Sequence, residues 1–161
     1  MRSIIAGLLS LCAAGCYGFT GGGLPADVKT VAIIPFENET NSADLPRELT
    51  EALRDGLERR LGLRSATEEK ASAIVRGKIT RYELDVPVAI SADRTQTSSA
   101  RRRLSIALDI ELVRQSDGKV LWQKTGLMAE GEYAERGEAT GRKQAIDRIV
   151  SDVIDGAQSQ W

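Results

Sequence analysis

The sequence predicts a two-layer α+β sandwich, with two helices on one face of a four-stranded mixed sheet in the order β-α-β-β-β-α. Three observations support this fold class. A nearly continuous apolar run at residues 28–36 is typical of a strand buried on both faces. Two stretches, 45–62 and 145–157, carry apolar residues at helical spacing. Residues 104–112 alternate in polarity and are followed by an Asp-Gly turn, which predicts an antiparallel hairpin.

The first strand and the first helix are joined by a polar loop. Pro35 ends the apolar run of the strand, and residues 37–44 have the composition of a turn. Asp44 is a suitable N-cap residue, and Pro46 suits the first turn of a helix. The apolar stripe that should face the sheet consists of Leu45, Leu49, Ala52, Leu53, Gly56, Leu57 and Leu61.

Three strands are predicted between the two helices. The strand that begins at Ala73 changes its buried parity, so we expect a bulge near Thr80 and Arg81. Residues 86–103 are expected to form a mobile connection. Strand 104–112 should then pair with strand 120–133, where Trp122 is expected to pack in the core. In the strand that begins at Ala73, the residues expected on the buried face before the bulge are Val75, Gly77 and Ile79, and those expected on it after the bulge are Tyr82, Leu84 and Val86. The first βαβ unit should be parallel and the later pairings antiparallel.

Composition narrows the possible classes of function. The chain has 161 residues, enough for one domain with a substantial core, and its net charge of -1 does not favour nucleic-acid binding. It contains no histidine, which excludes imidazole metal sites and histidine-dependent nucleophiles. Glu37 and Glu39 follow a strand end, where α/β enzymes often place chemistry, but no third ligand or basic partner stands beside them. An enzyme would therefore have to use carboxylate, lysine or hydroxyl side chains alone, which disfavours catalysis, and no metal or cofactor is expected.

The N-terminal segment has the organisation of a secretion signal. Arg2 precedes an apolar run at 4–11, and small residues follow at 12–16. Because the run is shorter than the about 20 residues that span a bilayer, a signal peptide over residues 1–15 is expected rather than a membrane helix. A buried N-terminal helix is the alternative, which the glycine-rich continuation disfavours.

Residues 13–16, with the sequence AAGC, resemble the bacterial lipobox, with Ala13 in the position usually held by leucine. The resemblance implies that Cys16 becomes the acylated first residue of the mature chain and anchors it to a membrane. Cys12 would leave with the signal, so no disulfide would form. Tyr17 in place of an aspartate favours the outer membrane, on its periplasmic side. Three glycines at 21–23 precede the first strand, so residues 16–27 are expected to be a flexible tether rather than a phosphate loop.

Residues 24–40 resemble the LptE family of lipopolysaccharide-assembly lipoproteins. The shared features are Leu24-Pro25, a strand that ends in Pro35-Phe36, and the triplet at 38–40. The DGKVLW motif at 117–122 and the order of the elements are also similar. The resemblance implies a single domain at 28–161 with a non-enzymatic role. Members of the family plug the lumen of the outer-membrane barrel LptD, assist its assembly and contact lipopolysaccharide on its way to the outer leaflet.

Arg94, Arg101, Arg102 and Arg103 form a basic cluster. Guanidinium groups bind phosphate bidentately, so this cluster predicts contact with lipopolysaccharide or with a protein partner. The alternative is a solvated strand end whose charges deter edge pairing. In a regular strand Arg101 and Arg103 would share one face and Arg102 would point away from it.

Two other classes of function remain open. One is a different periplasmic lipoprotein adaptor of similar fold, such as a secretion or cell-wall-synthase activator, because similar strands open curli-secretion-like lipoproteins and the N-terminal domain of TolB. The other is an envelope enzyme that depends on a carboxylate such as Glu37. The final residue, Trp161, suggests no role beyond packing on a partner.

Overall fold

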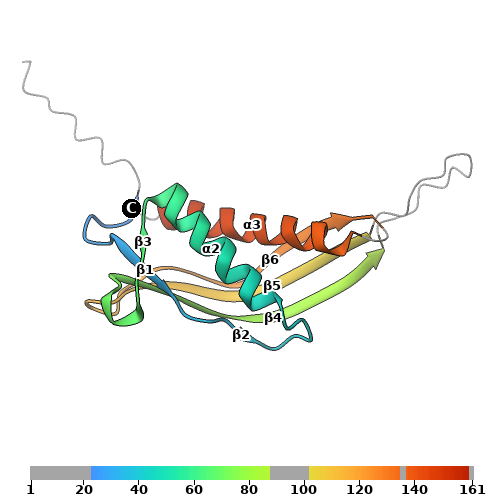
Figure 1. Cartoon of the computed structure of the whole chain (residues 1–161), viewed down its shortest axis with the longest axis horizontal. Helices are drawn as coiled ribbons and strands as arrows, with labels where there is room; N and C mark the ends of the chain where they lie inside the picture. Colours follow the sequence, from blue (N-terminus) through green and yellow to red (C-terminus); the bar gives the residue numbers. More distant parts are fainter. Residues whose placement is uncertain (1–22, 88–101, 135–136, 160–161) are drawn as a thin grey trace, which may run out of the picture.

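The structure is a computed structural model that describes residues 23–87, 102–134 and 137–159. Both helices lie on one face of a single long sheet, and in the described residues the opposite face carries no other element (Figure 1). This confirms the predicted two-layer α+β class. The elements are β1 (Thr30–Ile33), β2 (Glu37–Asn38), α2 (Leu45–Leu61), β3 (Arg64–Ser65), the 3-10 turn η2 (Glu68–Lys70), β4 (Ala73–Pro87), β5 (Arg102–Arg114), β6 (Val120–Tyr133) and α3 (Glu138–Ser159).

The described part of the sheet has six strands rather than the four that the sequence predicts. They lie in the order β3-β1-β4-β5-β6, and β2 also pairs with β4. β1 is parallel to β4, whereas β4, β5 and β6 form an antiparallel meander, both as predicted. The additional strands β2 and β3 have two residues each, which is too short to give a periodic pattern.

The register of β4 against β5 shifts between Ile79 and Arg81, which confirms the predicted bulge. The shift keeps the apolar side chains before and after it on the helix-covered face, where Ile79 is fully buried and Tyr82 is half-buried. The expectation that Leu84 is also buried is wrong, because its side chain is 43% exposed. This end of β4 extends beyond α2 (Figure 1).

The connection predicted at 86–103 is shorter than expected. β4 continues to Pro87, and β5 already begins at Arg102, two residues before the alternating pattern starts. Two of the predicted contact residues, Arg94 and Arg101, lie outside the described residues, as do Cys16 and Trp161.

Helix α2 begins and ends where the sequence predicts. Pro46 lies in its first turn, and Gly62 ends it with a left-handed φ of 66°. Asp44 occupies the N-cap position but makes no capping hydrogen bond, and its carboxylate lies 3.8 Å from Arg47 instead. The stripe that packs on the sheet contains four leucines with no exposed surface, namely Leu45, Leu49, Leu53 and Leu57.

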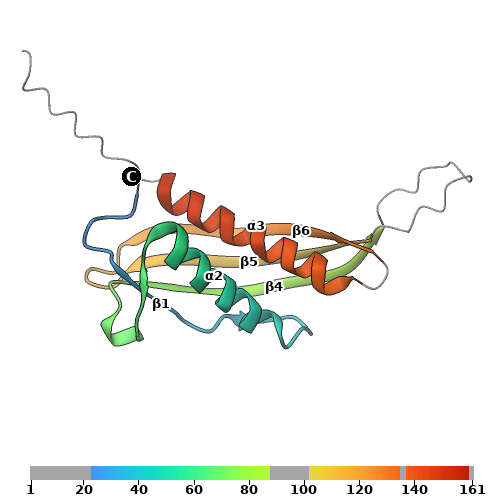
Figure 2. The same cartoon turned by 45° about the horizontal axis from the view of Figure 1, so that its top comes forward.

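Helix α3 runs along β5 and β6 beside α2 (Figure 2). It begins at Glu138, seven residues before its predicted apolar stripe, and that stripe is buried throughout. Trp122 packs in the core beneath it, with 6% of its surface exposed. Near the start of α3 the helix almost touches the sheet: a Cβ atom built on Gly131 would lie 1.7 Å from the carbonyl oxygen of Gly141. Among the described residues, no helix is long and apolar enough to span a bilayer.

Candidate functional site

The structure divides the two described arginines of the predicted cluster between the faces of β5. Arg102 shares the parity of Leu104, which is fully buried under the helices. Arg103 has the opposite parity and lies on the open face, where its Nη1 atom is 3.2 Å from Oε2 of Glu130 on β6. As predicted, these two neighbours do not converge on one point. Of the two described arginines, Arg103 is therefore the one whose guanidinium lies on the open face, where an external ligand could reach it.

The residue that holds Arg103 belongs to the edge strand of the sheet. Among the described residues, no strand pairs with the outer side of β6. Two side chains of α3 bind its outward backbone groups instead. The Arg148 guanidinium donates to the carbonyl oxygen of Glu130 at 2.7 Å, and the Gln144 side chain accepts from the N–H of Glu132 at 3.2 Å. These bonds occupy groups that a foreign strand would otherwise pair with.

The open face carries several paired charges beside apolar side chains such as Met128. It carries a hollow of about 520 Å³, whose lining includes Arg76, Lys78, Glu111 and Gln123. Arg76 is bonded to Glu111, and Lys78 lies 3.0 Å from Glu39 of the adjoining loop. The hydrogen bond to Glu39 raises the pKa of Lys78 above its ordinary value. These paired charges suit this part of the face to contact with other polar groups.

The expectation that Glu37 and Glu39 stand without a basic partner is wrong for Glu39, whose carboxylate lies 3.0 Å from Lys78 of β4. Glu39 is engaged by Lys78, and the described residues contain no group of three acidic or cysteine side chains that could hold a metal ion. Asn38 forms a turn: its Oδ1 atom accepts hydrogen bonds from the backbone N–H of Thr40 at 3.0 Å and from the Thr40 hydroxyl at 2.7 Å. This agrees with the interpretation of the 38–40 triplet as turn chemistry.

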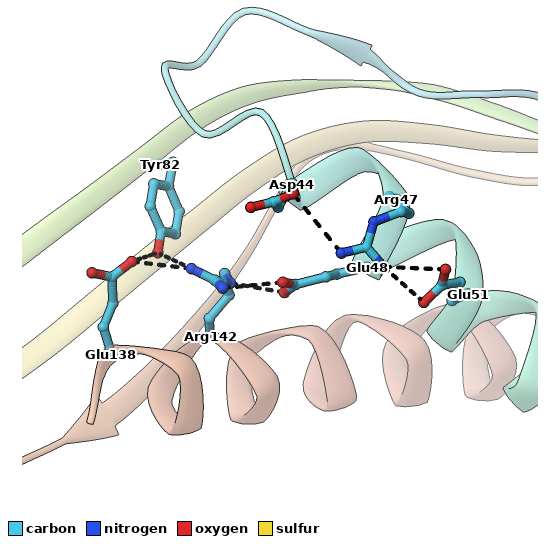
Figure 3. A network of polar contacts seen from close by, with 7 residues as sticks. All are labelled: Asp44, Arg47, Glu48, Glu51, Tyr82, Glu138 and Arg142. Atoms are coloured by element: carbon cyan, nitrogen blue, oxygen red, sulfur yellow. Dashed lines mark hydrogen bonds and ion pairs between the residues drawn. The ribbon is translucent and has the colours of Figure 1, made fainter. Parts of the chain in front are cut away.

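A polar network that the sequence does not predict joins α2, α3 and β4 (Figure 3). At its centre is Arg142, whose side chain is only 17% exposed. Its guanidinium binds Glu48 bidentately, with Nε–Oε2 at 2.7 Å and Nη2–Oε1 at 3.0 Å. The same group lies 3.1 Å from Glu138, and Glu138 accepts a hydrogen bond from the Tyr82 hydroxyl at 2.7 Å. The carboxylate of Glu48 raises the pKa of Arg142 further, so this cation stays charged at any pH at which the protein folds.

One contact of this network, the ion pair between Glu138 and Arg142, could be predicted from the sequence. Glu138 and Arg142 are four residues apart, the spacing of a helical ion pair. Glu48 and Arg142 are 94 positions apart, and each looks like a solvent-facing charge on an amphipathic helix. Only the packing of α2 against α3 brings them together.

The network gives the protein a specific response to alkaline pH. Burial, and then the hydrogen bond to Glu138, raise the pKa of Tyr82 to about 12. In the unfolded chain a tyrosine ionises near pH 10. The contribution of Tyr82 to stability is therefore complete below about pH 10 and is lost between about pH 10 and pH 12, a loss on the order of 1 kcal/mol after solvent screening.

This pH response can be measured by urea unfolding at pH 8 and at pH 11 for the wild type and for Tyr82→Phe. The wild type should lose more stability between the two pH values than the variant does. Equal losses in both proteins would show that Tyr82 does not carry the response.

Comparison with known proteins identifies a family and a shared fold. The family model described as LptE, lipopolysaccharide-assembly, matches residues 28–156. No curated protein matches the chain.

Among solved structures, a PelC dodecamer from Paraburkholderia phytofirmans is 16% identical with a TM-score of 0.53, over 86% of this chain and 94% of that one. A protein from Xanthomonas campestris is 9% identical with a TM-score of 0.58, over 86% and 91%. A hypothetical protein from Chlamydia trachomatis is 13% identical with a TM-score of 0.52, over 80% and 97%. At these identities the structural matches show the fold alone.

Proposed function

The chain belongs to the LptE family of lipopolysaccharide-assembly lipoproteins, and from this membership we propose that it is an outer-membrane component of the lipopolysaccharide translocon. In this role it fills the lumen of an LptD-type β-barrel, assists the assembly of that barrel and contacts lipopolysaccharide on its way to the outer leaflet. It acts as a binding and assembly protein and not as an enzyme.

The observation that carries the proposal is the extent of the family match, which runs from the residues before β1 almost to the end of α3. The open face of the sheet is compatible with it. The lumen of an outer-membrane barrel is polar, and paired charges such as Arg76–Glu111 and Lys78–Glu39 can face polar walls.

We also propose that a lipid anchor attaches the domain to the periplasmic side of the outer membrane. Residues 1–15 would be removed, Cys16 would carry the acyl groups, residues 16–27 would form the tether, and 28–161 would form the domain.

Replacing Cys16 with alanine is expected to abolish acylation and release the protein from membranes. Fractionation of cells fed a labelled fatty acid measures both effects, and a variant that still takes up label in the membrane fraction would contradict the assignment.

The proposed contact with lipopolysaccharide uses the basic cluster of Arg94, Arg101, Arg102 and Arg103. Its ligand groups are the phosphates of lipopolysaccharide, which guanidinium binds through charge-assisted hydrogen bonds. The described part of the cluster is compatible with this role because Arg103 is on the open face and 31% exposed.

Affinity purification from detergent-solubilised envelopes tests the function as a whole. A large β-barrel of the LptD type should be recovered at one-to-one stoichiometry, and depletion of the protein should reduce surface lipopolysaccharide. Recovery of a soluble secretion or cell-wall protein, with lipopolysaccharide export intact, would instead make the chain an adaptor of similar fold.

A further inference from the structure

Arg103 is held by a carboxylate that lies where an anionic ligand would bind. Its Nη1 atom is 3.2 Å from Oε2 of Glu130, with the two side chains 31% and 40% exposed. Glu130 stands opposite Ser105 in the β5–β6 register, and Glu132 stands opposite Arg103, so the ion pair is diagonal across two neighbouring strands. Both residues belong to paired strands, and the ion pair is formed in this structure.

The position of Glu130 is fixed from the other side of β6. Its carbonyl oxygen accepts a hydrogen bond of 2.7 Å from Arg148 on α3. Arg148 and Glu130 also line a hollow of about 450 Å³ at the edge of the sheet, together with Met128 and Asp152. The backbone bond anchors the strand at this residue and leaves the carboxylate itself bound to Arg103.

From this geometry we infer that Glu130 is an internal competitor for phosphate: it occupies Arg103 in the free protein and thereby sets the affinity of the open face for phosphate-bearing glycolipid. The inference rests on the proposed contact between the basic cluster and lipopolysaccharide. A phosphate that binds Arg103 has to displace the Glu130 carboxylate or approach it against like-charge repulsion.

The magnitudes allow this exchange. A solvent-exposed ion pair contributes little stability, so a ligand loses little by opening it. A phosphate offers the same guanidinium charge-assisted hydrogen bonds with more acceptor oxygens. Neutralising Glu130 while keeping its shape should therefore raise the affinity for a phosphate ligand by about two- to fivefold and leave the strand intact.

The test measures binding of purified lipopolysaccharide, and of the same material after enzymatic dephosphorylation, to the full-length mature protein. The variants are Glu130→Gln, Arg103→Gln and their combination. The control is Glu111→Gln, which neutralises another carboxylate of the same face that is bonded to Arg76. We expect Glu130→Gln to bind phosphorylated lipopolysaccharide more tightly, Arg103→Gln to bind it more weakly, and the double variant to lose the gain.

Each alternative result has one meaning. If Arg103→Gln weakens binding but Glu130→Gln does not strengthen it, the contact stands and the competitor role is wrong. The competitor role of Glu130 is also wrong if the gain persists after dephosphorylation, because the effect is then one of general charge. An equal gain in Glu111→Gln would show that release of Arg76 acts in the same way, so that Glu130 has no specific role. If neither Arg103→Gln nor Glu130→Gln changes binding, the proposed phosphate contact at Arg103 fails and the competitor role fails with it.

Discussion

Replacing Gly131 with alanine is expected to lower the free energy of unfolding by about 3 kcal/mol or more. The added Cβ atom would lie 1.7 Å from the carbonyl oxygen of Gly141, which belongs to the backbone of α3. A flexible side chain could turn away from such a contact, but the backbone of a helix cannot. To relieve it, α3 would have to move away from β6 and expose part of the apolar surface that the two elements share. Because small domains are stable by only about 5–15 kcal/mol, a loss of this size removes a large part of the total.

Urea unfolding followed by circular dichroism measures this loss. The matched control is Met128→Ala on the same strand, whose side chain is 57% exposed on the open face and should be replaceable with little effect. An unchanged unfolding midpoint for Gly131→Ala would show that β6 and α3 lie farther apart than the structure places them.

Replacing Arg142 with methionine is expected to destabilise the protein by about 2 kcal/mol. Methionine keeps most of the apolar stem but leaves the Glu48 carboxylate, 29% exposed, without its bidentate partner. A fully buried pair broken in this way costs about 3–5 kcal/mol, and the partial exposure of Glu48 reduces that figure. Glu138 is more exposed, at 42%, and adds little.

Two further variants separate the ion pair from other effects at Arg142. Adding Glu48→Gln to Arg142→Met should recover part of the loss, because the amide that replaces the carboxylate is easier to bury unpaired. Arg59→Met should have almost no effect, since Arg59 pairs with Asp55 at 2.9 Å but both side chains are more than 60% exposed. If Arg59→Met and Arg142→Met behave alike, the network at Arg142 is only a surface pair.

Those parts of the fold that follow from local patterns could be predicted from the sequence. The helical stripe from Leu45 to Leu61, the parity change near Thr80 and the alternation from Leu104 to Leu112 each reflect the burial of one face of one element. A two-residue strand has no periodicity, so β2 and β3 could not be found in this way. Similarly, the preference of aspartate for helix N-caps identified the position of Asp44, but its backbone is helical (φ -81°, ψ -22°) rather than extended, and its side chain makes no capping hydrogen bond.

The candidate site was harder to predict because its partners come from different elements. The sequence identifies Arg103 as basic and near a strand start, but nothing near it in the chain points to Glu130, which lies on the next strand. The register of β5 against β6, set by two bulges and the hairpin turn, decides which carboxylate reaches this arginine. Glu48 and Arg142 meet for the same kind of reason, since the crossing of two helices is a property of the whole fold.

Helix α3 follows every described strand in chain order, and this order determines when the domain can complete its core. A polypeptide is synthesised from its N-terminus, so β5 and β6 leave the ribosome before the helix that covers their apolar side. Until α3 follows, only α2 covers this face, and side chains that lie under α3, such as Leu104 beside Gly141, lack part of their cover. The core of the domain is therefore completed only when α3 has been made, and a nascent chain that stops before this helix leaves apolar surface of β5 and β6 exposed.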